Sequence, residues 1–255
     1  MLKISSLLLA LFIFSLPQAG RAYASDPLRD LVIGESLEFI VRWNGISVGT
    51  VSTTVEELTE IQGREAYKVV IRATTNEWAS LIYKVDDRYI TYIDYETSGS
   101  LRHEVDRSEG RYRKKAVIDY IYGRFLAEYH YLKSGNKKSV DVEGVVHDPV
   151  SALYYFLRCE LTPGKKIALN IDLNEKKYHL FVGIENGHAI RLPRLGRFDT
   201  VMARPYLERK GKPYNRGNGL GYISNGEDRL PVFAVASVFP WGRFSATLLS
   251  RSPSY

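Results

Sequence analysis

The chain has 255 residues and a formal net charge of +6 at pH 7. Its only cysteine, Cys159, excludes an intramolecular disulfide, so the stability of the fold must come from its core. The excess of cations is small and is not gathered in a tail, as it is in many nucleic-acid-binding proteins, so we expect no nucleic acid as a partner.

The first 24 residues have the layout of a secretory signal peptide. Lys3 precedes an apolar run at residues 7–16, and the small residues Ala22 and Ala24 frame the expected cleavage site. An uncleaved membrane anchor needs about 20 apolar residues, which is longer than this run. We therefore predict cleavage after Ala24, a periplasmic or secreted protein, and a single β-rich domain over residues 25–255 with no transmembrane helix.

The residues from Glu35 to His147 alternate apolar and polar side chains with the period of two that β-strands show. The clearest feature is a predicted hairpin, because Asn44-Gly45 supplies the two positive-φ residues that a two-residue turn needs. The strands of this hairpin are expected at 35–43 and 46–58. Further strands are predicted at 64–75, 82–94, 101–107, 112–120, 125–132 and 138–145.

The pattern changes to helical spacing after His147. Asp148 is a suitable N-cap and Pro149 suits the first helical position, while Pro163-Gly164 is typical of a helix end. The apolar positions Val150, Leu153, Leu157 and Leu161 then recur at helical spacing. We expect one short helix whose apolar stripe covers an open end of a curved sheet, with Cys159 as a small buried residue of that helix.

Strands resume after the helix. They are predicted at 166–173, 176–185, 198–206, 219–224, 232–238 and 242–249, and residues 208–219 are interpreted as a mobile, charged loop. The fold class that follows is mainly β. We expect a curved antiparallel sheet or incomplete β-barrel of roughly a dozen strands with one short helix packed against it, and a β-sandwich is the second choice.

His147, Asp148 and Ser151 have the residue types of a catalytic triad. A working triad normally draws its members from separate elements, whereas these three lie at one helix start, where capping explains them better. Asp86-Asp87 and Glu227-Asp228 could supply carboxylates for glycoside hydrolysis. Neighbouring residues on a strand point to opposite faces, however, so neither dipeptide makes such a pair by itself.

The histidines do not show the short spacing of a zinc site, so we predict no metal and no cofactor. Ligands that converge from different strands remain an alternative. The five histidines are His103, His130, His147, His179 and His188.

Basic residues cluster at 107–115 and 191–216, and tyrosines accompany them. Cations mixed with aromatic rings can hold the phosphate or carboxylate of an anionic envelope lipid or glycan. Ordinary solvated loop charge is the alternative explanation. The predicted ligand-binding residues are Arg111, Arg113, Arg191, Arg194, Arg197, Tyr206 and Tyr214.

Four segments together resemble the exported Gram-negative proteins of domain-of-unknown-function family 3108. They are 34–39, 43–49 (Trp-Asn-Gly-Ile-Ser-Val-Gly), 148–155 (Asp-Pro-Val-Ser-Ala-Leu-Tyr-Tyr) and the closing segment with Pro231-Val232 and residues 239–248. The resemblance implies export and a β-rich fold, and it supplies no activity and no catalytic residues. Residues 222–228 depart from the family, whose members often carry a Trp and an acidic pair there.

These observations favour a non-enzymatic protein of the periplasm that binds an envelope lipid or glycan, or handles it as a chaperone does. Two alternatives remain at this point. One is an envelope hydrolase whose carboxylates or metal ligands come from separate strands. The other is an assembly or scaffold protein of the envelope. The sequence does not predict the oligomeric state.

Overall fold

The computed structural model describes residues 30–214, 218–238 and 240–252, so the predicted signal peptide lies outside the described residues. Two α-helices occur in this part of the chain, α2 (Glu77–Tyr83) and α3 (Pro149–Arg158). The strands before α3 are β1 (Ser36–Trp43), β2 (Ile46–Ile61), β3 (Arg64–Thr75), β4 (Asp86–Asp94), β5 (Ser100–Glu109), β6 (Tyr112–Ile121), β7 (Leu126–Tyr131), β8 (Lys137–Asp141) and β9 (Val146–His147). The strands after it are β10 (Lys166–Asp172), β11 (Lys177–Asn186), β12 (Ile190–Leu192), β13 (Gly196–Phe198), β14 (Thr200–Arg209), β15 (Lys212–Pro213), β16 (Asn218–Ser224), β17 (Pro231–Val238) and β18 (Gly242–Ser252).

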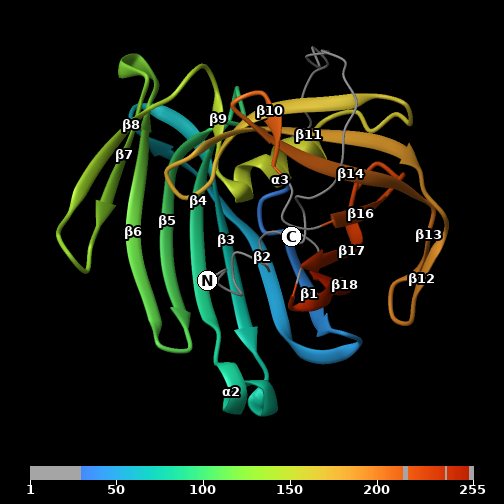
Figure 1. Ribbon diagram of the computed structural model, residues 1–255. Helices are drawn as coiled ribbons and strands as arrows, with labels where there is room; N and C mark the ends of the chain where they lie inside the picture. Colours follow the sequence, from blue (N-terminus) through green and yellow to red (C-terminus); the bar gives the residue numbers. More distant parts are fainter. Residues whose placement is uncertain (1–29, 215–217, 239, 253–255) are drawn as a thin grey trace.

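Sixteen of these strands form one curved sheet that wraps around α3 (Figure 1). Their order is β8-β7-β6-β5-β4-β3-β2-β1-β18-β17-β16-β14-β11-β10-β9, with β15 paired to β14. The edge strands β8 and β9 do not pair with each other, so the sheet stays open. The predicted curved sheet or incomplete barrel is therefore confirmed, and the sheet has more strands than the dozen expected.

The pairing of β1 with β18 joins the two ends of the described chain. It is antiparallel and runs from Ser36 opposite Ser252 to Trp43 opposite Phe244. On the other side of β1, the predicted hairpin to β2 is confirmed, because Asn44 (φ 46°) and Gly45 (φ 88°) adopt the left-handed conformations that its turn requires. These local and long-range pairings hold the central strands of the sheet together.

Helix α3 begins as the sequence predicts. The Asp148 side chain accepts hydrogen bonds from the backbone N–H groups of Val150 and Ser151, and Pro149 follows it. The helix ends at Arg158, earlier than predicted, because Cys159 already has extended dihedral angles and acts as its C-cap. Leu161 lies after the helix but is buried in the core, which explains why the apolar spacing extends beyond the helix end.

Three buried clusters fill the concave side of the sheet. The first joins α3 to β10, β11 and β14, and the second joins α3 to β2–β7. The third joins β1, β17 and β18 to Leu192 of the β12–β13 hairpin. Each cluster draws on residues far apart in the sequence, so the core depends on non-local contacts.

Two local predictions are wrong, and one hairpin was not predicted. The strand predicted from Ile82 begins only at Asp86, as β4. Ile82 and Tyr83 belong instead to α2, because Asn76 caps a helix that runs through them. Residues 208–219 are not one loop: β14 extends to Arg209 and turns back through β15, because their backbones pair. The short hairpin of β12 and β13 was also missed, since its strands have three residues each.

Candidate functional site

An apolar pocket of about 260 Å³ opens at the end of the sheet where α2 lies. In Figure 1 this end is at the bottom, away from α3. The walls of the pocket come from β1, β2, β3, α2 and the β17–β18 turn with the start of β18. Their side chains include Val41, Val48, Ala79 and Phe244, and the surface that the lining presents to the pocket is mainly apolar. Such a space favours an apolar ligand group.

All three tryptophans of the chain line this space, and we call it the tryptophan pocket. The indole Nε1–H of Trp43 donates to the backbone oxygen of Trp241 (2.6 Å), and that of Trp78 donates to the backbone oxygen of Ser47 (3.1 Å). The polar atoms of these two indoles are therefore already bonded within the protein. Their apolar ring surfaces remain partly exposed and can contact a ligand.

Two turns hold Trp43 and Trp241 next to each other although 198 positions separate them. The Asn44 backbone N–H donates to the carbonyl of Arg243 (2.7 Å), and the Arg243 N–H donates to the Asn44 side-chain oxygen (2.8 Å). Gly242 has a φ of 92°, and a Cβ there would lie 2.6 Å from the Asn44 side chain. The contact between the β1–β2 and β17–β18 turns thus requires glycine at this position.

Helix α2 forms the opposite wall of the tryptophan pocket. Its N-cap, Asn76, accepts from the Ala79 N–H (3.1 Å) and donates through Nδ2 to the Ser47 carbonyl (2.9 Å). Asn76 also donates its backbone N–H to Val48. These bonds attach α2 to the start of β2. They leave Leu81 and Ile82 89% and 78% exposed.

A buried group of charges lies beside α2. Arg107 donates from Nε to Glu109 Oε1 (2.7 Å), and Asp87 accepts from the Ser108 N–H (2.8 Å) and the Tyr89 hydroxyl (3.2 Å). Burial raises the pKa of Asp87 to about 6, since the charged carboxylate is desolvated more than its partners compensate.

The turn between β5 and β6 connects this charge cluster to the pocket. A Cβ on Gly110 would lie 3.0 Å from the Tyr83 ring, so this turn packs against the pocket wall. Burial, with a smaller contribution from Glu109, also raises the pKa of the Tyr83 hydroxyl. Tyr83 therefore stays neutral near physiological pH and adds to the uncharged wall.

The predicted ligand-binding residues lie on several elements and do not form one site. Arg111 and Arg113 are exposed and follow Gly110 in the β5–β6 hairpin, and the Arg113 guanidinium donates to the Gly110 carbonyl (2.8 Å). These two arginines thus lie next to the α2 wall of the tryptophan pocket. Their binding of an anionic ligand remains a prediction.

The other predicted residues lie in the separate β12–β13 hairpin, on β14 and after β15. Arg191 and Arg197 face each other in the β12–β13 hairpin, and Arg194 lies in its turn. Tyr206 is buried and stacks on Phe181 (5.0 Å between ring centroids), and Tyr214 packs against Tyr178 (4.9 Å). The two tyrosines thus make packing contacts within the protein.

The tryptophan pocket was not predicted from the sequence. One usable signal was the position of Trp43 and Trp241 directly before turn residues, where strand ends are exposed. Another was the adjacent pair Leu81-Ile82, because two consecutive apolar residues on a strand cannot both face one core. Nothing in the sequence placed these segments together, since their contact depends on the pairing of β1 with β18.

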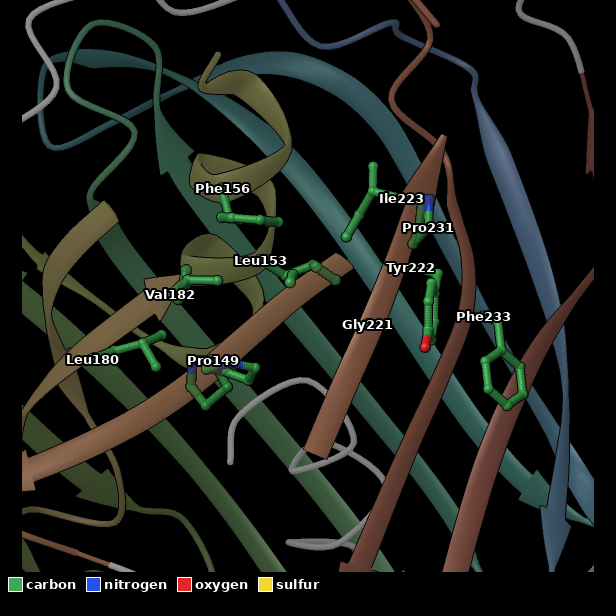
Figure 2. Close-up of a pocket in the computed structure, with 13 residues that line it drawn as sticks. Pro149, Leu153, Phe156, Leu180, Val182, Gly221, Tyr222, Ile223, Pro231 and Phe233 are labelled. Carbon is green, nitrogen blue, oxygen red and sulfur yellow. The ribbon is translucent and has the colours of Figure 1, made fainter. Parts of the chain in front are cut away.

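By contrast, the space under α3 is filled. The cavity between α3 and strands β11, β14, β16 and β17 has a volume of about 40 Å³. Figure 2 shows Leu153 and Phe156 of the helix directed toward Ile223 of β16, with Leu180 and Val182 of β11 on the other side. A second cavity, between α3 and β1–β3, measures about 30 Å³. Spaces of this size hold about one water molecule each, so neither takes an acyl chain.

The start of α3 carries a buried network of polar side chains. The Ser100 hydroxyl donates to Asp148 Oδ2 (2.6 Å) and lies 2.7 Å from the Ser151 hydroxyl. Thr91 donates to Asp148 Oδ1 (3.1 Å) and lies 2.8 Å from His103 Nδ1. These groups satisfy one another, and all five side chains are buried. The network attaches α3 to β4 and β5, and the predicted capping role of Asp148 is confirmed.

The Nδ1 atom of His147 lies outside this network and is buried without a hydrogen-bond partner. Burial lowers the pKa of His147 from 6.5 to about 4. A second buried carboxylate, Asp172, accepts from the hydroxyls of Tyr120 and Tyr129, and burial raises its pKa. Asp172 of β10 is thereby linked to β6 and β7. Within the described ranges, no three or more His, Cys, Asp or Glu side chains are arranged to hold a metal ion.

No helix among the described residues has the length and apolar character needed to cross a membrane. No curated protein matches the chain. Among solved structures, a β-barrel-like protein of domain-of-unknown-function family DUF1849 from Brucella abortus aligns with a TM-score of 0.56 and 8% identity, over 87% of this chain and 98% of the other. At this identity the similarity shows a shared fold.

Two further solved structures align over most of their length with lower TM-scores. One, described as an exported protein with a YmcC-like fold from Bacteroides fragilis, has a TM-score of 0.32 and 12% identity over 87% of this chain and 96% of the other. The other, described as a lipoprotein from Parabacteroides distasonis, has a TM-score of 0.38 and 9% identity over 88% and 100%.

The family model of DUF3108, a protein family of unknown function, matches residues 38–248. This range begins in β1 and ends in β18, so it includes α3 and the curved sheet except for the first residues of β1 and the last residues of β18. The resemblance noted in the sequence is therefore confirmed, and the chain belongs to the DUF3108 family.

Proposed function

We propose that this protein is a non-enzymatic binding protein of the cell envelope and that the tryptophan pocket takes up an acyl chain of a lipid. The observation that carries the proposal is a pocket of about 260 Å³ that is open to solvent, mainly apolar, and lined by every tryptophan of the chain. Indole rings and aliphatic side chains gain free energy when an acyl chain removes them from water.

The surroundings of the pocket support an amphiphilic ligand. Arg111 and Arg113 lie in the neighbouring hairpin and can contact an anionic head group while the acyl chain occupies the pocket. A glycan would also stack on tryptophan rings, but it needs hydrogen-bond partners, and Val41, Val48 and Phe244 offer none. Location in the periplasm is part of this proposal, and the signal-peptide pattern at residues 1–24 supports it.

Tryptophan fluorescence tests this proposal because every tryptophan of the chain lines the pocket. Purified protein is titrated with a fatty acid that carries bromine atoms on its chain, and bromine quenches indole emission on contact. We expect saturable quenching. Trp241→Ala should weaken binding by roughly 10-fold, the equivalent of about 1.4 kcal/mol of lost apolar contact.

Leu132→Ala is the matched control, because Leu132 is a large exposed apolar residue outside the pocket. This variant should bind the brominated fatty acid as the wild type does. Unchanged tryptophan emission at a saturating concentration of the fatty acid would refute the proposed function. Equal weakening by Trp241→Ala and Leu132→Ala would show nonspecific adsorption and would refute it as well.

A further inference from the structure

The apolar residues around the tryptophan pocket extend onto the surface of the protein. Six of the twelve large apolar side chains that are exposed in the described part of the chain gather here. We call these six the α2 face: Trp43, Ile46, Trp78, Leu81, Ile82 and Trp241.

Contacts between neighbouring elements make the α2 face continuous. Trp43 pairs with Ile46 across the β1–β2 hairpin, and its indole donates to the Trp241 carbonyl. Trp78 of α2 donates to the carbonyl of Ser47, the residue after Ile46. Leu81 and Ile82 follow on the same short helix. The α2 face therefore spans α2 and two turns that meet at one end of the molecule (Figure 1).

The geometry of α2 keeps Leu81 and Ile82 in solvent. Asn76 holds the start of the helix against β2, and Ala79 is the buried residue of the helix. Within this anchored helix, Leu81 and Ile82 have no core to enter and remain the two most exposed large apolar residues that the structure describes. Exposure of this kind marks a surface that meets an apolar partner.

The charges next to the α2 face are mainly positive. Its flanks and adjoining turns carry four exposed cations and two exposed acids, so the excess at this end is cationic. The cations are Lys84, Arg111, Arg113 and Arg243, and the acids are Glu77 and Asp86. Glu109 and Asp87 lie nearby but are buried with Arg107. Tryptophan and leucine within a cationic rim match the acyl boundary and head groups of an anionic bilayer.

We propose that the protein docks on an anionic lipid bilayer through the α2 face, with Leu81 and Ile82 inserted among the acyl chains. Docking places the opening of the tryptophan pocket at the bilayer surface, where an acyl chain can enter without crossing water. That last step rests on the proposed function, whereas docking itself requires only the surface residues.

Vesicle flotation tests the docking. The protein is mixed with vesicles of phosphatidylglycerol and phosphatidylcholine, or of phosphatidylcholine alone, and the bound fraction is measured after centrifugation. We expect at least a 10-fold higher partition coefficient on the anionic vesicles. Leu81→Ser should lower it by roughly 10-fold, because the inserted apolar side chain is lost. Added salt and the pair Arg111→Gln and Arg113→Gln should also lower it.

Leu132→Ser is the control, since it makes the same replacement at an exposed site away from the α2 face. Its partition coefficient should equal that of the wild type. Docking is refuted if the wild type does not float with anionic vesicles, or if Leu81→Ser floats as well as Leu132→Ser. It is also refuted if the wild type is a dimer that Leu81→Ser dissociates, because the α2 face would then bind a second copy.

Quenching by the brominated fatty acid without vesicles separates the two proposals. Leu81 does not line the tryptophan pocket, so Leu81→Ser should keep the wild-type quenching. Quenching without flotation would support the binding function and refute the docking. Flotation without quenching would support the docking and refute the proposal that the tryptophan pocket binds an acyl chain.

Discussion

The two α-helices that the structure describes begin alike and have different surroundings. Asn76 caps α2 and Asp148 caps α3, each through a side-chain oxygen that accepts a backbone N–H. Helix α3 is enclosed by the sheet, with cavities of about 40 and 30 Å³ beside it. Helix α2 adjoins a pocket of about 260 Å³.

This difference suggests a division of roles, in which the α3 end of the sheet stabilises the fold and the α2 end carries the proposed binding site. At the start of α3, the side chains of Ser100, Asp148 and Ser151 are buried and bonded to one another, so they offer no polar group to a ligand. At α2 the polar groups of Trp43, Trp78 and Asn76 are bonded within the protein, and the apolar surfaces of the two indole rings remain partly exposed. The following predictions test this separation.

The largest effect is expected for Asp148→Ala. Asp148 caps α3 and also accepts from Thr91 and Ser100, so the change leaves several buried donors without a partner. We expect the free energy of unfolding to fall by about 3–5 kcal/mol, measured by urea denaturation followed by circular dichroism. A loss of less than about 1 kcal/mol would mean that the network contributes little beyond an ordinary cap.

The second prediction concerns the loss of stability in acid through protonation of His147. The folded-state pKa of His147, about 4, lies below its ordinary value of 6.5, so the unfolded chain binds the proton more tightly. Stability from this group is complete above about pH 6.5 and is lost as the pH falls toward 4, by up to about 3 kcal/mol. His147→Gln should remove this loss, and the measurement is urea denaturation at several pH values across that window.

Asp87, near α2, makes stability depend on pH in the opposite direction from His147. Its pKa of about 6 in the folded protein lies above the ordinary 3.8, so its contribution is greatest at low pH and is lost as the pH rises through 6. In His147→Gln the stability should therefore decline as the pH rises from about 4 to about 6. A continued strong loss of stability in acid would contradict the assignment of the acid sensitivity to His147.

Local sequence signals predicted the α3 region much better than the α2 region. Asn44-Gly45 and Asp148-Pro149 each specify a turn or a cap through the chemistry of adjacent residues. The curved sheet followed from alternating apolar residues along many short strands. The tryptophan pocket could not be predicted in this way, since β1 must pair with β18 before Trp43 and Trp241 meet. The arginine and tyrosine clusters were close in sequence but lie on separate elements, because sheet order and chain order differ.

The smallest effect is expected at the cap of α2. Asn76→Ala removes the hydrogen bonds to the Ala79 N–H and the Ser47 carbonyl, and we expect a loss of about 1 kcal/mol, since both sites are partly solvated. Asn76→Asp is the matched variant: it keeps the acceptor for the helix and loses the donor to Ser47. If the cap alone positions α2, Asn76→Asp should bind the brominated fatty acid like the wild type and Asn76→Ala should bind it more weakly. If the bond to Ser47 positions the helix, both variants should bind more weakly, and the wall of the pocket is then fixed by β2 and not by the helix start.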